Sequence, residues 1–127
     1  MDMDTEKIVN GSDFGLVVDI PTLNGVPYDA RNGEWELDLW VFSNKRVRVK
    51  HSIEKGVESI GEVQANAVVE DDDNGVEVIK VFIKASKNPM GKGELKGQMT
   101  IYAENWNFED YIQVIKTFEC EIGVRIV

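Results

Sequence analysis

The sequence is poor in the residues that most often carry nucleophilic chemistry, with one cysteine and one histidine among its 127 residues. A single cysteine excludes an intramolecular disulfide. Alternation around Cys120 places it on the apolar face of a strand, which predicts a small hydrophobic side chain rather than a nucleophile. His51 stands about seventy positions earlier, beside basic residues that favour its protonation. We therefore expect no Cys–His catalysis and no enzyme.

Long apolar runs are also missing. No run approaches the roughly 20 residues that a transmembrane helix needs. The chain begins Met-Asp-Met-Asp-Thr-Glu, which is acidic where a secretory signal is basic. We therefore expect no membrane partner and no export by a signal peptide.

Basic residues are fewer than acidic ones, with 14 Lys and Arg against 23 Asp and Glu and a net charge of −9. This charge repels phosphate backbones, so we expect no nucleic-acid partner. The local exception is Lys45, Arg46, Arg48, Lys50 and His51. Arg46, Arg48 and Lys50 alternate with Val47 and Val49, so these three cations should line one face of a strand. That face is either a solvated edge strand or a docking surface for an acidic partner.

Helix-period patterns of useful length are absent, and segments 52–59 and 106–112 are expected to form short turns at most. Period-two alternation covers most of the chain and predicts about seven strands. The expected strands are 14–20, 35–42, 46–50, 63–69, 76–85, one beginning near 95, and 111–126. The turn residues Asn24-Gly25 and Asn74-Gly75 separate strands, and the second pair is interpreted as a hairpin turn because both of its residues tolerate positive φ.

These strands predict an all-β fold, an antiparallel β-sandwich of immunoglobulin-like size, because an isolated sheet would leave its apolar face uncovered. The cysteine pair around a tryptophan that marks immunoglobulin domains is absent. We expect a flexible amino-terminal segment over 1–10 and one domain over 11–127. The predicted core consists of Phe14, Leu16, Val18, Leu37, Leu39, Ile101, Phe118, Cys120, Ile122 and Val124.

Trp40 and Phe42 break the simple pattern. They share the strand face of Glu36 and Asp38, opposite Leu37 and Leu39. Either a bulge resets the alternation, or a loop such as 22–32 covers the two rings, or they form a second apolar surface for a partner. Together with Arg46, Arg48 and Lys50 they are the candidate interface residues.

No metal, cofactor or catalytic site is expected from the acidic motifs. Glu70, Asp72, Asn74 and Gly75 match the first half of an EF-hand loop, but the closing position is Val81 and the flanking segments are strands. Carboxylates such as Glu34, Glu36 and Asp38 lie on one strand face and are interpreted as solubilising residues rather than a hydrolytic pair.

Several pieces of the chain together resemble the small β-sandwich proteins of phage and prophage tails, in particular the amino-terminal domains of baseplate and receptor-binding-assembly proteins. The resembling pieces cover about half of the chain and are Gly11-Ser12-Asp13-Phe14, Asn24-Gly25-Val26-Pro27-Tyr28-Asp29, Gly93-Glu94-Leu95-Lys96, Asn105-Trp106-Asn107-Phe108-Glu109-Asp110 and Ile122-Gly123-Val124-Arg125-Ile126-Val127. The penultimate loop keeps Phe108 and Asp110 but lacks the proline and glycine typical of that family. The segment 43–92 has no counterpart.

The resemblance implies a structural or adaptor protein of a virion, assembled in the bacterial cytoplasm, with no chemistry of its own. Its partners would be other tail proteins or further copies of the same chain, as in a homo-oligomer. The alternative is a carbohydrate-binding β-sandwich module, with Trp40 and Trp106 as the aromatic platforms for sugar rings.

Overall fold

The computed structural model describes residues 5–127, which form thirteen strands and no helix. The strands are β1 (Glu6–Ile8), β2 (Phe14–Asp19), β3 (Thr22–Leu23), β4 (Val26–Pro27), β5 (Glu34–Trp40), β6 (Val47–Ser52), β7 (Gly56–Ser59), β8 (Ala65–Asp71), β9 (Glu77–Ile83), β10 (Gly93–Glu94), β11 (Lys96–Glu104), β12 (Ile112–Cys120) and β13 (Val124–Ile126). Seven of them have six or more residues, and these correspond to the seven segments predicted from alternation.

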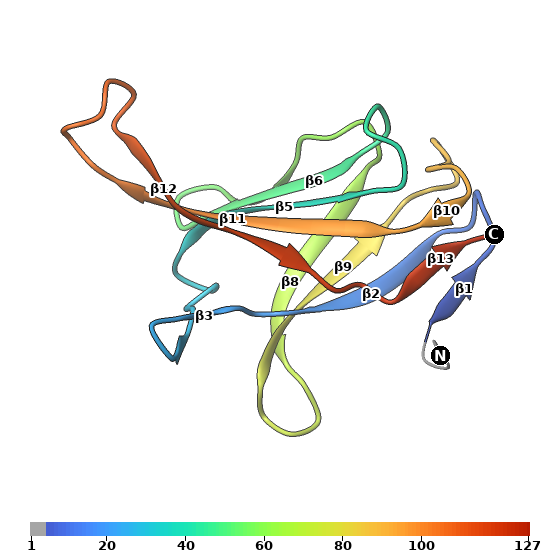
Figure 1. The fold of residues 1–127 in the computed structure, drawn as a ribbon, viewed down its shortest axis with the longest axis horizontal. Coiled ribbons are helices and arrows are strands. Elements are labelled where there is room, and N and C mark those ends of the chain that lie inside the picture. Colours follow the sequence, from blue (N-terminus) through green and yellow to red (C-terminus); the bar gives the residue numbers. More distant parts are fainter. Residues whose placement is uncertain (1–4) are drawn as a thin grey trace.

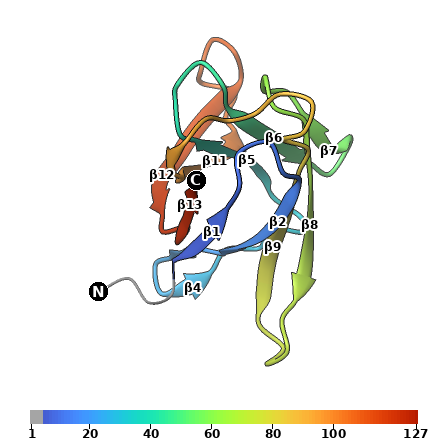
Figure 2. The ribbon, with the colours of Figure 1, turned by 90° about the vertical axis from the view of Figure 1, so that its right-hand side faces the viewer.

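The fold is an antiparallel β-sandwich, as predicted. One layer is a five-stranded sheet in the order β12-β11-β5-β6-β7, and the other is a three-stranded sheet in the order β2-β9-β8. Figure 1 shows β8 and β9 running across the direction of β5 and β6. A third sheet, β1-β13-β10, closes one end of the molecule, and only Leu95 separates β10 from β11. Figure 2 shows this small sheet beside the two layers.

The core between the layers contains most of the predicted residues. Leu16, Val18, Leu37, Leu39, Ile101 and Val124 are buried, while Phe14, Phe118, Cys120 and Ile122 are partly buried and pack against the core. Trp35 is fully buried at the centre, where it stacks on His51 with ring centroids 5.2 Å apart. Its indole N–H donates to the carbonyl oxygen of Ala30 at 2.8 Å. The loop 22–32 therefore contacts Trp35, whereas Arg46 lies over Trp40 and Phe42 is exposed.

The alternation rule fails within the last long strand. Ile101 pairs with Lys116 and Tyr102 pairs with Val114, so Ile115 is an additional residue that forms a β-bulge. The residues of β12 before the bulge therefore lie on the face opposite to the one that continuous alternation predicts. As a result Ile112 and Val114, which we expected on the core face, are exposed to solvent.

Shorter elements also differ from expectation. Residues 6–8 of the expected flexible segment form β1, which pairs in parallel with β13, whereas residues 1–4 lie outside the described residues. Part of segment 52–59 forms strand β7 instead of a turn, because Gly56–Ser59 pairs with β6. The β3–β4 hairpin turns at Asn24 and Gly25, which both have positive φ. The β8–β9 hairpin turns as predicted at Asn74-Gly75, where Gly75 has a positive φ.

A close backbone crossing joins the two layers between β7 and β8. The N–H of Ile60 donates to the carbonyl of Arg48, and the N–H of Val63 donates to the carbonyl of Arg46. Gly61 lies between these contacts, where a Cβ atom would stand 2.7 Å from the backbone nitrogen of Arg48 and closer still to the carbonyl oxygen of Arg46. Only glycine fits this position without moving one of the two chains.

We predict that Gly61→Ala lowers the free energy of unfolding by about 1 to 3 kcal/mol, because the added methyl group meets backbone atoms that have no room to withdraw. Gly15→Ala in β2 is the matched control, since its Cβ would have an ordinary 3.4 Å contact with the Phe82 ring. Urea unfolding followed by tryptophan fluorescence measures both. Equal stability of the two variants would contradict the prediction.

Candidate functional site

The outer face of the five-stranded sheet carries a cluster of charged side chains in which the two carboxylates are largely excluded from water. Glu36 and Asp38 on β5 are each only 8 % exposed, although they point away from the core. The Arg48 guanidinium on β6 lies between them: its Nε is 3.0 Å from Glu36 Oε1 and 3.0 Å from Asp38 Oδ1. The Tyr102 hydroxyl donates to the other Glu36 oxygen at 3.3 Å. Both faces of β5 are therefore buried.

Burial also changes the acidity of these groups. Loss of hydration raises the pKa of Asp38, the neighbouring Glu36 carboxylate adds to that shift, and Arg48 opposes it. Burial and the Glu36 carboxylate together raise the pKa of Tyr102. The two carboxylates share one guanidinium, so the cluster is a structural ion network rather than a solubilising surface.

The basic stripe has a different environment from the one expected. β6 is an interior strand between β5 and β7, so the interpretation as a solvated edge strand is wrong. Arg48 is bound by Glu36 and Asp38, and the Lys50 ammonium lies 3.8 Å from Glu34. These two cations face carboxylates of the same molecule. Arg46 instead lies over the Trp40 ring, with its guanidinium carbon 4.4 Å from the ring centroid.

Trp40 and Phe42 lie outside the core, as the alternation of residues along this segment predicts. Trp40 ends β5 on the outer face and is half-buried beneath Arg46. Phe42 follows the strand, and its ring rests on Gly91, where a Cβ atom would stand 2.6 Å from the ring. The Phe42 side chain is nevertheless 54 % exposed. The end of β5 and the residues after it thus carry one half-buried and one exposed aromatic ring.

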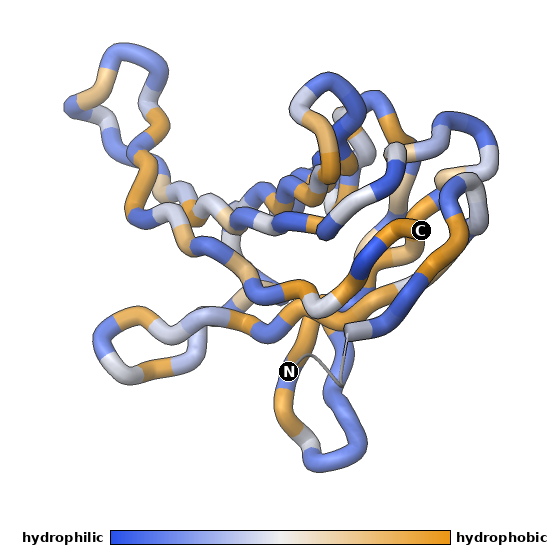
Figure 3. Tube along the Cα trace, turned by 45° about the vertical axis from the view of Figure 1, so that its right-hand side comes forward, coloured by the Kyte–Doolittle hydropathy of each residue, from blue (hydrophilic) through white to orange (hydrophobic). Residues whose placement is uncertain are grey.

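Of the most exposed apolar surface, sequence reasoning named Trp106 alone, as a platform for sugar rings. Beyond Tyr102, which pairs with Glu34 at the start of β5, the β11–β12 hairpin extends away from the rest of the sheet (Figure 1). We name residues 103–115 the arm. Its exposed apolar side chains are Trp106, Phe108, Tyr111, Ile112, Val114 and Ile115. Figure 3 shows hydrophobic and hydrophilic residues interspersed along it. The sequence feature that could have indicated this surface is the presence of three aromatic residues, Trp106, Phe108 and Tyr111, within the predicted turn 106–112.

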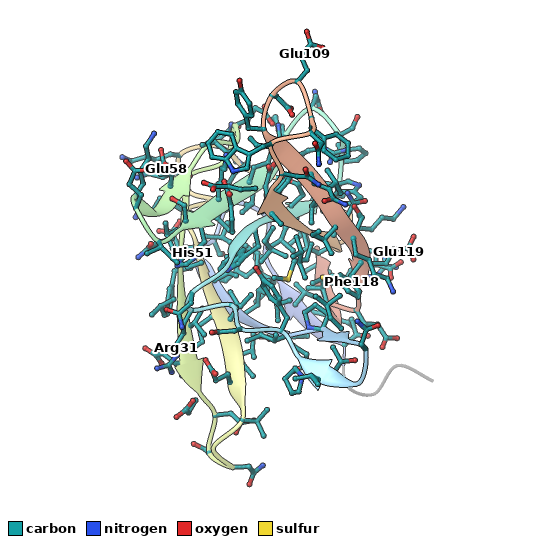
Figure 4. The ribbon with its side chains drawn as sticks, turned by 90° about the vertical axis from the view of Figure 1, so that its left-hand side faces the viewer. Arg31, His51, Glu58, Glu109, Phe118 and Glu119 are labelled. Atoms are coloured by element: carbon teal, nitrogen blue, oxygen red, sulfur yellow. The ribbon has the colours of Figure 1, made fainter. Side chains whose placement is uncertain are left out.

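The tip of the arm has a defined conformation. Phe108 N–H donates to Asn105, Tyr111 N–H donates to Phe108, and Tyr111 has a φ of 61°. The Trp106 and Tyr111 rings are in contact, with centroids 5.1 Å apart and planes tilted by 58°. Trp106 is still 77 % exposed. Figure 4 shows Glu109 at the outer end of the arm, directed away from the molecule.

β12 is also an edge of the five-stranded sheet. In Figure 4, Phe118 is directed toward the interior and Glu119 away from it. Near this edge, a hollow of about 540 Å³ is lined by residues that include Trp40, Glu94, Gln98, Glu119 and Cys120. Burial raises the pKa of the Cys120 thiol, which suits the predicted packing role better than that of a nucleophile.

The acidic hairpin between β8 and β9 uses its own side chains to form the turn. Asp72 Oδ1 accepts hydrogen bonds from the backbone N–H groups of Asn74 and Val76. Over residues 5–127 no group of three or more His, Cys, Asp or Glu side chains is arranged to hold a metal ion. Within the same range, no helix is long and apolar enough to cross a membrane.

Comparison with family models, with curated proteins and with solved structures finds no match for this chain. The resemblance to phage tail proteins therefore depends on the residues quoted above.

We predict that Arg48→Met lowers the free energy of unfolding by about 2 kcal/mol or more, because it leaves Glu36 and Asp38 buried without the cation that binds both. Lys50→Met is the control: its pair with Glu34 is longer, and the Glu34 side chain is 31 % exposed against 10 % for Glu36, so a loss within about 1 kcal/mol is expected. Chemical unfolding at pH 7 measures both changes. A larger loss for Lys50→Met would show that Arg48 does not hold the cluster.

The raised pKa of Asp38 predicts a pH dependence. In the folded protein this carboxyl binds a proton at higher pH than in the unfolded chain, so its contribution to stability increases as the pH falls from neutral toward about 4. Wild type should therefore gain stability relative to Asp38→Asn over that range, as measured by urea unfolding at several pH values.

Asp13 provides a control of opposite sign. Hydrogen bonds from Lys84 and Ser86 lower its pKa from 3.8 to about 2, so its contribution is present above pH 4 and is lost as the pH falls toward 2. Wild type should lose stability relative to Asp13→Asn in that window. The same sign of change for both variants would contradict the assignment of Asp38.

Proposed function

We propose that this chain is a non-catalytic structural or adaptor protein that acts through protein–protein contacts, and that it works in the tail or baseplate of a phage or prophage. The observation that carries the first part is the arm. Its six large apolar side chains are exposed together on a segment that projects from the sandwich. The second part depends on the sequence resemblance.

An exposed apolar surface of this kind has a cost unless a partner covers it. Soluble proteins rarely expose contiguous large apolar patches, and those that they expose are commonly contact surfaces. Aromatic residues are enriched at such surfaces because each ring buries a large area with few rotatable bonds. The arm combines Trp106, Phe108 and Tyr111 in this way. Its ordered tip reduces the conformational entropy that binding would cost.

A carbohydrate-binding module is the second candidate, and the hollow beside Trp40 favours it. Sugar sites combine an aromatic ring with hydrogen-bonding side chains, and Trp40, Gln98 and Glu119 line the same hollow. Arg46 covers one face of the indole, so only the other face is available to a sugar ring.

Immunogold electron microscopy tests the proposed function directly. Antibodies against the chain should label the tails of particles released from cells that carry its gene. A Trp106→Ser, Phe108→Ser chain is expected to fold, because both side chains are exposed, but to be missing from the particles. A Val26→Ser chain, changed at an exposed residue of the β3–β4 hairpin, should be incorporated normally.

A glycan array on the purified chain separates the two candidates. The assembly function predicts no glycan signal. Specific glycan binding that Trp40→Ala abolishes, together with unlabelled particles, would replace it with the carbohydrate-binding function.

A further inference from the structure

The two ends of the five-stranded sheet carry aromatic surfaces of opposite charge. The arm has Glu104, Glu109 and Asp110, and there is no Lys, Arg or His between Lys96 and Lys116. At the other end lies a group that we name the Phe42 patch, which consists of Trp40, Phe42, Lys45, Arg46 and Lys92. Arg46 lies over Trp40, the N–H of Lys45 donates to the carbonyl of Phe42, and Lys92 follows Gly91, on which the Phe42 ring rests. Figure 1 shows the β11–β12 loop and the loop after β5 at opposite ends of the sheet.

The cations of the Phe42 patch are available to a partner. Among residues 5–127, the ion pairs involve Arg31, Arg48, Lys50, Lys80 and Lys84, and none of them involves Lys45, Arg46 or Lys92. Glu62 accepts the backbone N–H of Arg46 at 2.9 Å, and Glu94 and Glu119 line the hollow beside Trp40. The acids of the hollow stand beside Trp40, whereas Phe42, which is 54 % exposed, lies beside cations that form none of these ion pairs.

An arm cannot reach the Phe42 patch of its own molecule. β11 has nine residues between Lys96, which pairs with Trp40, and Glu104 at the base of the arm tip. At about 3.3 Å per residue this strand separates the two surfaces by about 26 Å. Contact between them requires a second copy of the chain.

We propose that the arm of one copy docks on the Phe42 patch of a second copy, so that the chain assembles head to tail. The aromatic rings of the arm cover Phe42, and Glu109 and Asp110 face Lys45, Arg46 and Lys92. This inference rests on the proposed function in protein assembly and names the partner as a second copy. Because the two surfaces differ, each added copy leaves one arm and one patch free, which produces a ring or an open chain.

Sedimentation velocity of the purified chain is the first test. Wild type should associate in a concentration-dependent manner. Trp106→Ser on the arm and Phe42→Ser with Arg46→Glu on the patch should each raise the dissociation constant at least about tenfold. Phe82→Ser is the matched control, because Phe82 is 51 % exposed on the outer face of the other sheet, and it should associate as wild type does.

Mixing the two defective proteins is the decisive test. The Trp106→Ser chain keeps its patch and the Phe42→Ser, Arg46→Glu chain keeps its arm, so an equimolar mixture should form a one-to-one pair that grows no further. A contact between identical surfaces, such as pairing of two β12 edges, cannot be restored in this way. Circular dichroism of each variant establishes that it is folded.

The inference is overturned if wild type stays monomeric at high concentration, if either arm or patch variant associates normally, or if the mixture does not pair. These outcomes leave the particle-labelling result untouched, so head-to-tail assembly can fail while the tail function stands. Labelled particles with a monomeric chain would assign the arm to a different tail protein.

Discussion

The Arg48 guanidinium is the constraint on which the five-stranded sheet depends. β5 is central in that sheet, with hydrophobic residues on one face and two carboxylates on the other, and both faces are buried. Buried carboxylates are tolerated only when a cation and hydrogen bonds replace the water that they lose. Arg48 binds both carboxylates because its Nη2 donates to Glu36 while its Nε–H is shared between Glu36 and Asp38. Shifting β6 along β5 would separate these groups, so the ion network also sets the strand register.

Alternation predicted the long strands because each of them packs apolar side chains of one face against the core, and successive side chains of any strand point to opposite faces. It did not predict β1 and β7, which have three and four residues and form only because β13 and β6 offer unpaired edges. It also could not show that β6 is interior. The interior position of β6 depends on β7, which alternation did not predict. The sequence therefore indicated two separate solvated faces, one with Arg48 and one with Glu36 and Asp38, instead of one ion network.

The same limit explains the assignment of the candidate interface residues. Parity placed Trp40 and Phe42 outside the core, where the structure has them, but it could not show that Arg46 folds over the Trp40 ring. On β12 the rule failed because the bulge at Ile115 reverses the faces of the residues before it. A bulge is specified by the pairing of two strands and leaves little trace in one strand's pattern. The pattern of β12 alone therefore did not predict that the apolar side chains of the arm are exposed, because this depends on how β12 pairs with β11.

A net charge of −9 and a head-to-tail contact are compatible because they act over different distances. At physiological ionic strength charges are screened over about 8 Å, so the general repulsion between two copies is weak except at contact. Ion pairs between the arm and the Phe42 patch would form inside that distance, beside rings that exclude water. General repulsion opposes random association, and the local complementarity selects one orientation. Lowering the salt strengthens both effects, whereas high salt removes the local attraction and leaves only aromatic burial to hold the copies together.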